Sequence, residues 1–147
     1  MNITGSIAIV LSIGLLSLTI SSSGQTAGVQ FINITNLHTG DNVSWQQSIE
    51  GDSSAVANSG LNVYLLIWPI EAYGPWWVQQ TQTFPDGTWQ SNANFGRNPK
   101  MFPEDIGTTY KVEAVMTNEV LKPGMTLAEL PSVPKSDRSE IITVKRI

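Results

Sequence analysis

The chain has 147 residues, 41% of them hydrophobic, which is enough for one folded domain with an ordinary core behind an N-terminal segment. It carries 12 acidic and 8 basic side chains, and a formal net charge of −4 with no basic residue before Arg97 argues against a nucleic-acid partner. The absence of cysteine rules out a small scaffold held together by disulfides.

The first predicted element is an apolar helix over residues 7–20, in an N-terminal head of residues 1–28. The first forty residues of the chain contain no Asp, Glu, Lys or Arg. Ser21 and Ser23 precede Gly24 as a small residue pair typical of a signal-peptide cleavage site. A membrane anchor is the alternative, although the run is short of the length that spans a bilayer and lacks flanking charge. We expect residues 1–28 to be a signal peptide or an anchor, and residues 29–147 to be an exported domain. The membrane is a partner only if the head is retained.

Seven short segments behind the head alternate apolar and polar residues and predict β-strands. In the second, Val43, Trp45 and Ile49 are expected on one face. The third is apolar on both faces, as in a central strand. Asp86-Gly87 predicts a tight hairpin turn between the fourth and fifth. The seven segments are residues 29–34, 43–49, 62–68, 76–84, 88–92, 109–116 and 140–145.

The two longest connections, residues 96–107 and 118–138, carry the helical signals. Pro103 followed by Glu104 and Asp105 predicts the start of a helical turn. Thr126 and Glu129 form a capping box, which predicts one or two further turns.

These elements predict an all-β fold, an antiparallel β-sandwich of about seven strands. Parallel pairing requires crossover connections, usually helices, and the sequence offers no substantial helix after the head. We therefore expect every strand pair to be antiparallel.

Two stretches resemble the immunoglobulin-like modules of prokaryotic cell surfaces. Residues 34–43, followed by Ile49-Glu50-Gly51, are similar to the opening strands and turn of such modules, although the usual turn proline is missing. Residues 105–114 are similar to the strand of the tyrosine corner, with Tyr110 as the tyrosine and Val112 where disulfide-bearing members have cysteine. The resemblance implies an Ig-like sandwich in a surface context and no particular activity.

The aromatic residues between Tyr64 and Phe95 are the best candidates for recognition. Tyr73, Trp76 and Trp77 belong to one predicted turn and the strand after it, and such rings can stack on sugars while nearby Gln side chains bind hydroxyls. Filling of the core is the competing interpretation. Because side chains alternate along a strand, Trp76 and Trp77 point to opposite faces, so at most one faces outward.

Other chemistry has weaker support. Asp41, Asp52, Asp86, Glu104 and Asp105 lie in predicted loops without the spacing of a calcium loop, so we expect no metal site and no cofactor. His38 is the single histidine, and we interpret it as a solvated turn residue. The Gly-x-Ser-x-Gly motif of serine hydrolases is absent, so we expect that the protein is not an enzyme. Asn33-Ile34-Thr35 and Asn42-Val43-Ser44 are sequons that make Asn33 and Asn42 candidate glycosylation sites.

The sequence thus predicts a non-enzymatic, exported Ig-like domain at the cell surface or outside the cell, with a structural or adhesive role. Its partners would be glycans or other surface proteins. A small carbohydrate-binding module that uses Tyr73, Trp76 and Trp77 is one alternative. A pilin-like filament subunit is another, because an apolar helix before a β-domain is also that architecture.

Overall fold

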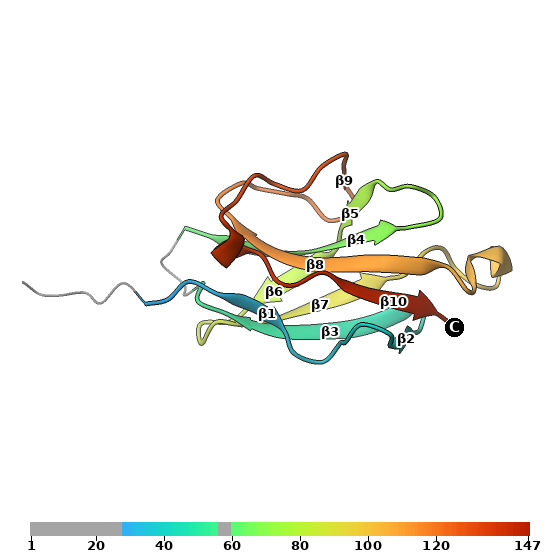
Figure 1. The fold of residues 1–147 in the computed structure, drawn as a ribbon, viewed down its shortest axis with the longest axis horizontal. Helices are drawn as coiled ribbons and strands as arrows, with labels where there is room; N and C mark the ends of the chain where they lie inside the picture. Colours follow the sequence, from blue (N-terminus) through green and yellow to red (C-terminus); the bar gives the residue numbers. More distant parts are fainter. Residues whose placement is uncertain (1–27, 56–59) are drawn as a thin grey trace, which may run out of the picture.

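The computed structural model describes residues 28–55 and 60–147, which form two β-sheets packed face to face (Figure 1). The all-β sandwich expected from the sequence is confirmed for this part of the chain. The predicted apolar helix lies in residues 1–27, outside the described residues. Within the described residues, no helix has the length and hydropathy needed to cross a membrane.

The two sheets differ in size. The four-stranded sheet has the order β1 (Ile32–Ile34), β3 (Gln46–Ser53), β7 (Thr88–Asn94) and β6 (Gln80–Thr83). The six-stranded sheet has the order β2 (Asn42–Val43), β10 (Ile142–Arg146), β8 (Thr109–Thr117), β4 (Asn62–Pro69), β5 (Trp76–Val78) and β9 (Thr126–Leu127). Two short 3-10 turns, η1 (Pro103–Asp105) and η2 (Lys135–Asp137), lie in the connections.

The main core fills the space between the sheets. Strand β4 contributes Val63, Leu65 and Ile67 from alternate positions, and they pack with side chains of the facing sheet such as Ile49 and Trp89. Strand β8 turns four alternate side chains into the same core, and all four are buried: Tyr110, Val112, Ala114 and Met116.

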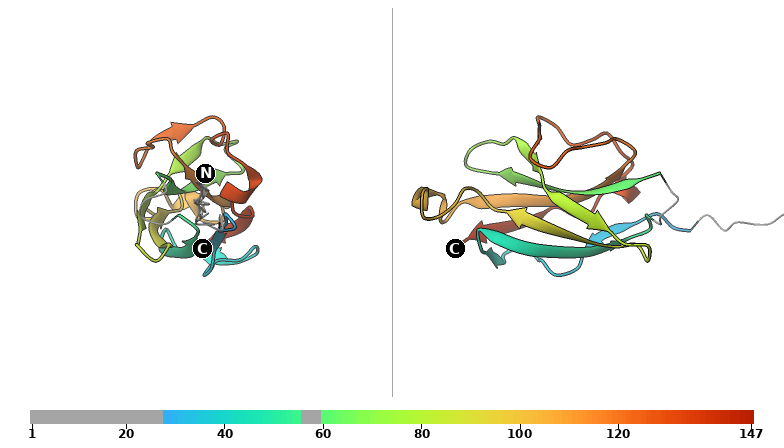
Figure 2. Two further views of the ribbon diagram at one scale, coloured as in Figure 1. Left: turned by 90° about the vertical axis from the view of Figure 1, so that its left-hand side faces the viewer. Right: turned by 180° about the vertical axis from the view of Figure 1, so that it is seen from behind.

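A second apolar cluster lies on the opposite face of the six-stranded sheet. Leu66 and Val115, which alternate with the residues of the main core, meet Trp76, Val78 and Leu121 there. The segment of residues 118–141 covers this face, as the orange and red chain over β4 and β5 shows in Figures 1 and 2. Strand β4 is therefore covered on both faces, as its unbroken apolar run predicts.

Two predicted strands are in fact divided between the sheets. Val43 ends β2 in one sheet and Ile49 lies in β3 of the other, so the prediction of a single strand face was wrong. Residues 76–84 divide likewise at Gln79, into β5 and β6. Because the inner faces of both sheets point into one core, a chain that changes sheet keeps the alternation of a single strand. The two divisions and the added β9 raise the strand number above the expected seven.

The hairpin predicted at Asp86-Gly87 is confirmed. Strands β6 and β7 pair antiparallel with Thr83 opposite Trp89. Gly87 has a φ of 88°, which favours glycine, and the Thr88 amide donates to Asp86 Oδ1 over 3.0 Å.

The expectation that all pairs are antiparallel was wrong in one place. Strands β2 and β10 are parallel, with Lys145 opposite Asn42 and Arg146 opposite Val43. These strands come from the two ends of the domain, so the whole sandwich serves as the crossover that parallel pairing requires.

The helical turn predicted at Pro103 is confirmed as η1, but the one predicted at Thr126 was wrong. Thr126 and Leu127 pair with Trp77 and Trp76 of β5 instead. An unpaired sheet edge leaves backbone groups without partners, and β9 satisfies those of β5 while Leu127 packs on the second cluster.

Candidate functional site: a groove at the edge of the sandwich

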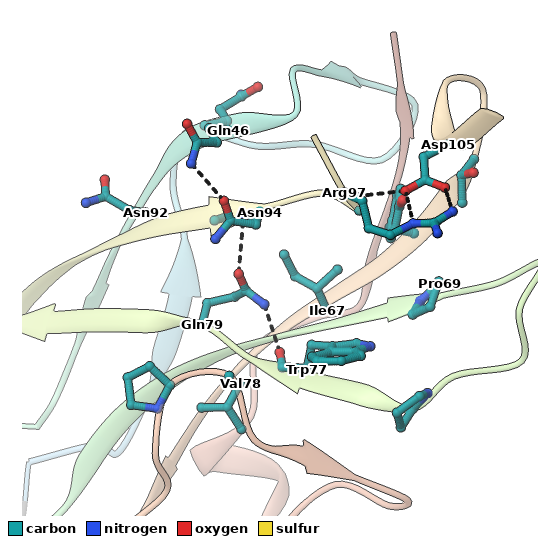
Figure 3. Close-up of a pocket in the computed structure, with 18 of the residues that line it drawn as sticks. Gln46, Ile67, Pro69, Trp77, Val78, Gln79, Asn92, Asn94, Arg97 and Asp105 are labelled. Carbon is teal, nitrogen blue, oxygen red and sulfur yellow. Dashed lines mark hydrogen bonds and ion pairs between the residues drawn. The ribbon is translucent and has the colours of Figure 1, made fainter. Parts of the chain in front are cut away.

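A groove of about 1150 Å³ opens where the chain crosses from β5 to β6. At this point the six-stranded sheet includes β5, whereas β6, the edge strand of the four-stranded sheet, only begins at Gln80. One wall comes from β4, β5 and the loop between them, and the other from β3, β7 and Gln79 (Figure 3). Its volume suits part of an extended ligand such as a peptide or an oligosaccharide.

Trp77 forms the aromatic part of the first wall. It lies opposite Ile67 in the β4–β5 pair, so its ring projects from the inner face of the sheet, and it is 44% exposed. Its backbone is held from two sides, by Ile67 of β4 and Thr126 of β9. The ring therefore stands in a position fixed by its neighbours, with one part open to solvent.

Trp76 points the other way and is only 7% exposed. Its ring packs on Trp68 with centroids 5.4 Å apart and planes at 54°, within the second cluster. The expected division of the two rings between opposite faces is confirmed. Trp76 belongs to the packing of the domain, and Trp77 alone of the pair lines the groove.

Tyr73 lies at the tip of the loop between β4 and β5 and is 88% exposed. Its φ of 55° is in the left-handed region, which costs a tyrosine about 1–3 kcal/mol. Two backbone hydrogen bonds hold the loop, from Tyr73 to Ile70 and from Gly74 to Pro69. Ala72 and Gly74 line the groove and Tyr73 does not, so the structure places this ring beside the groove.

The opposite wall is built of amides joined in a chain of hydrogen bonds (Figure 3). Gln79 is buried; its Oε1 accepts from the Asn94 backbone over 2.9 Å and its Nε2 donates to the Trp77 carbonyl over 3.1 Å. Gln46 donates to Asn94 Oδ1 over 3.1 Å. Asn92, the next exposed position of β7, makes no side-chain hydrogen bond with any of the described residues. Asn92 and Asn94 alternate with Ala93 of the main core, so their amides point to the outer face of the four-stranded sheet, whereas Trp77 projects from the inner face of the other sheet.

Charged groups gather at one end of the groove. Asp105 Oδ2 accepts from the Arg97 backbone over 2.8 Å and from Arg97 Nε over 3.0 Å, while Nη2 donates to Oδ1 over 2.7 Å. Nη2 also donates to Glu104 over 3.1 Å, and the guanidinium carbon lies 3.9 Å from the ring centroid of Phe102. The hydrogen bond from Arg97 holds the pKa of Asp105 below its usual value and raises the pKa of Arg97 in turn.

Glu71 supplies a further carboxylate at this end. Burial raises the pKa of Glu71, but hydrogen bonds from its own backbone and from Thr109 outweigh that effect, so the pKa is lowered. The Thr109 amide lies 3.0 Å and 2.9 Å from the two carboxylate oxygens. Glu71 is therefore an anion that pins the β4–β5 loop to the start of β8.

Behind this end lies a fully buried cation, Arg146, whose side chain is 0% exposed. None of its three guanidinium nitrogens has a hydrogen-bond partner in the described residues. The nearest carboxylate is Asp105, with Oδ2 3.7 Å from Nη1. A Cβ on Gly96 would lie 2.8 Å from Nη1 and 2.9 Å from that Oδ2, so glycine is needed where the chain passes this pair. Asp105 is thus the shared counterion of Arg97 and Arg146.

The amides of Asn92 and Asn94 and the Arg97–Asp105–Arg146 group were not anticipated from the sequence. One signal was available: between Glu71 and Arg97 the only charged residue is Asp86. A stretch with so little charge and so many amides and rings indicates a neutral surface. Arg97 and Asp105 lie eight residues apart in one connection, but Arg146 comes from distant β10, and no local pattern joins it to them.

The remaining candidate residues lie elsewhere. His38 is exposed in a turn, with Nδ1 3.6 Å from an Asp41 carboxylate oxygen. Among the described residues, no three His, Cys, Asp or Glu side chains come together as a metal site. Asn33 and Asn42 are both exposed, and the Asn33 amide donates to Asp52 over 3.1 Å.

The chain matches no protein-family model, no curated protein and no solved structure. Its function must therefore be inferred from the groove and the fold.

Proposed function

We propose that this chain is a non-enzymatic, exported domain of the immunoglobulin-like type with an adhesive role at the cell surface. The strand order supports the type. The order β1-β3-β7-β6 facing β10-β8-β4-β5 corresponds to the sheets ABED and GFCC′ of such domains, with Tyr110 near the start of the strand equivalent to F. Val112, fully buried, stands where a disulfide-bearing member has cysteine.

The single observation that carries a binding role is the half-exposed ring of Trp77 in a groove walled by amides. A domain that serves only as a spacer gains nothing from an indole exposed in a concave site, because exposed aromatic surface is costly in water. The titratable groups nearby, Glu71, Arg97 and Asp105, are all engaged in hydrogen bonds or ion pairs that hold the loops. The arrangement fits non-covalent binding.

A glycan is the ligand that this groove favours, which joins the carbohydrate-binding alternative to the adhesive one. An indole face packs against the apolar face of a sugar ring, and amides donate to and accept from hydroxyls. Trp77 lines the groove together with several amide side chains, and of these Gln47 leaves its strand on the inner face, opposite Ala93 of the main core.

The test uses the full chain in mild detergent on a glycan array and on glycan-coated beads. Trp77→Ala should abolish binding and adhesion without loss of the folded far-ultraviolet spectrum. Phe31→Ala is the matched control, because Phe31 is a comparably exposed ring outside the groove, and it should leave binding unchanged. Glycan binding that survives Trp77→Ala in a folded protein would place the site elsewhere.

Export and anchoring concern residues outside the described structure and are tested by sequencing the N-terminus of the native protein. A start at Met1 indicates an anchor, and a start near Gly24 or Gly28 indicates a cleaved signal peptide. A start within the apolar run indicates the pilin-like alternative.

A further inference from the structure

We propose that the groove binds saccharides that carry an N-acetyl group, with Gln47 donating a hydrogen bond to the acetamido carbonyl while the sugar ring packs on Trp77. This inference rests on the glycan-binding function above and names the class of glycan.

Two residue pairs from facing sheets form this part of the groove. Trp77 lies opposite Ile67 in the β4–β5 pair (Figure 3). Gln47 lies opposite Ala93 in the β3–β7 pair. Ile67 and Ala93 both belong to the main core, and residues directly opposite each other share a face, so all four side chains leave their strands on the inner faces. All four line the groove, so the Trp77 ring and the Gln47 amide border one space between the sheets.

The four side chains lie at two depths. Ile67 and Ala93 are 2% and 1% exposed and form an apolar floor. Trp77 is 44% exposed and Gln47 is partly exposed, so the ring and the amide stand at the rim. The sheets of a sandwich lie about 10 Å apart, and a side chain as small as that of Ala93 leaves part of this spacing free. A methyl group that reaches the floor is removed from water, which is favourable.

The Gln47 amide has a fixed orientation. Its Oε1 accepts from the Ser44 backbone N–H over 3.1 Å, and of the two ends of an amide only the oxygen can accept. Nε2 carries two hydrogens and makes no hydrogen bond with the described residues. Gln47 therefore presents donors to the groove, and a ligand has to supply an acceptor.

The neighbouring polar groups impose the same requirement. The indole Nε1 of Trp77 is a donor only, and it has no hydrogen-bond partner in the part of the chain that the structure describes. The Gln79 oxygen already accepts from the Asn94 backbone, and both Asp105 oxygens accept from Arg97. Among the described residues that line the groove Arg97 is the only cation, and it is paired in this way. The unused donors thus belong to neutral groups, which a neutral carbonyl matches.

An N-acetyl group meets both conditions of this space. Its carbonyl oxygen accepts from Gln47, and its methyl group covers the floor formed by Ile67 and Ala93. A hydroxyl at the same carbon has no methyl group, and it brings a hydrogen of its own that needs an acceptor. The groove therefore favours the acetamido sugar over the corresponding hydroxyl sugar.

The experiment compares chitotetraose with cellotetraose, which share one β-linked glucose backbone and differ only in the acetamido group at C2. Binding of the full chain in mild detergent is measured by titration calorimetry. We expect at least about 10-fold tighter binding of chitotetraose, from one added hydrogen bond and one buried methyl group. Trp77→Ala should abolish the binding of both, because the ring packs on the backbone that they share.

Two variants of Gln47 test the donor. Gln47→Glu keeps the shape and still accepts from Ser44, but its carboxylate has no hydrogen to donate at neutral pH. Gln47→Met removes the donor without adding a charge. In each variant the preference for chitotetraose should shrink at least about 5-fold, with cellotetraose affinity changed by less than about 2-fold. Gln82→Glu and Gln82→Met alter an exposed amide outside the groove in the same ways and should leave the preference unchanged.

The possible results separate the inference from the function on which it rests. A preference for chitotetraose that both Gln47 variants weaken supports the inference. Equal binding of the two tetrasaccharides, or a preference that survives both variants, overturns it and leaves glycan binding intact. Binding of neither tetrasaccharide also overturns it, and the glycan array with Trp77→Ala then decides the glycan-binding function separately.

Discussion

The shared counterion Asp105 offers the sharpest test of the structure. Asp105→Asn keeps the shape of the side chain and removes its charge. The three hydrogen bonds from Arg97 weaken, but Arg97 is half exposed and can turn to water and to Glu104. Arg146 has no such alternative, because its guanidinium is fully buried and Asp105 is its nearest carboxylate at 3.7 Å.

The expected loss of stability in Asp105→Asn comes mainly from buried Arg146 and not from half-exposed Arg97. Removing one partner of a buried ion pair costs about 3–5 kcal/mol, because an uncompensated charge stays buried. The 3.7 Å separation involves no hydrogen bond, so we expect the lower end, about 3 kcal/mol. For a domain of this size that is a fall in Tm of about 10 °C.

The assay is urea unfolding followed by tryptophan fluorescence, with thermal unfolding as a second probe. Arg146→Met in the Asp105→Asn background should recover most of the loss, because an apolar side chain of similar length needs no counterion. Glu104→Gln is the matched control and should change stability little, since Glu104 is exposed and does not contact Arg146. A loss below about 1 kcal/mol for Asp105→Asn, or no recovery in the double variant, would refute the reasoning.

Ionisation of Asp105 also makes the stability of the folded protein depend on pH in acid. The pKa of Asp105 is lowered in the folded state, chiefly by the hydrogen bond from Arg97. A lowered pKa means that the folded protein holds the proton less tightly than the unfolded chain, so the stabilisation is complete above the unfolded pKa of about 3.9. It is lost as the pH falls from there through the folded pKa. Asp105→Asn should therefore flatten the pH dependence of unfolding below about pH 4, and an unchanged acid profile would contradict this.

Three further predictions concern the packing. Gly51→Ala should destabilise by at least about 2 kcal/mol in urea unfolding, because its Cβ would overlap the Asn33 carbonyl and the Trp89 ring; Gly28→Ala, with open space around it, is the control. Glu113→Gln should cost about 2 kcal/mol of unfolding free energy, because buried Glu113 accepts two hydrogen bonds from Arg138, at 2.6 Å and 3.2 Å, that tie the 118–141 segment to β8. The loss should appear as faster amide exchange at Ser139, whose N–H donates to the Ala114 carbonyl. Unchanged exchange at Ser139 would contradict the prediction. Trp76→Ala should cost about 3–5 kcal/mol and Trp77→Ala clearly less, and equal losses by thermal unfolding would show that both rings are core residues.

Much of the β-structure could be predicted because its signals are local. The run from Asn62 to Pro69 is apolar on both faces, and β4 is indeed central and covered twice. Asp86-Gly87 allows the φ that a tight turn requires, and β6 and β7 form that hairpin. In each case the residues that determine the outcome are adjacent in the chain, so the pattern is complete within one segment.

The points that were missed depend on distant segments. Residues 43–49 alternate like one strand although the chain changes sheet within them, since both sheets share one core. The pairing of β2 with β10 joins the two ends of the domain. Thr126 and Glu129 form a good local capping box, but the open edge of β5 offers backbone partners that a lone helical turn lacks.

The alternation of Trp76 and Trp77 by itself determined that the two rings face opposite sides of a strand. Only the tertiary structure decided which ring is covered. The 118–141 segment lies over the outer face and buries Trp76, whereas the four-stranded sheet does not extend over β5 and leaves Trp77 open. Burial depends on what packs against a face from elsewhere in the chain, and for that reason the candidate groove could not be read from the strand that carries it.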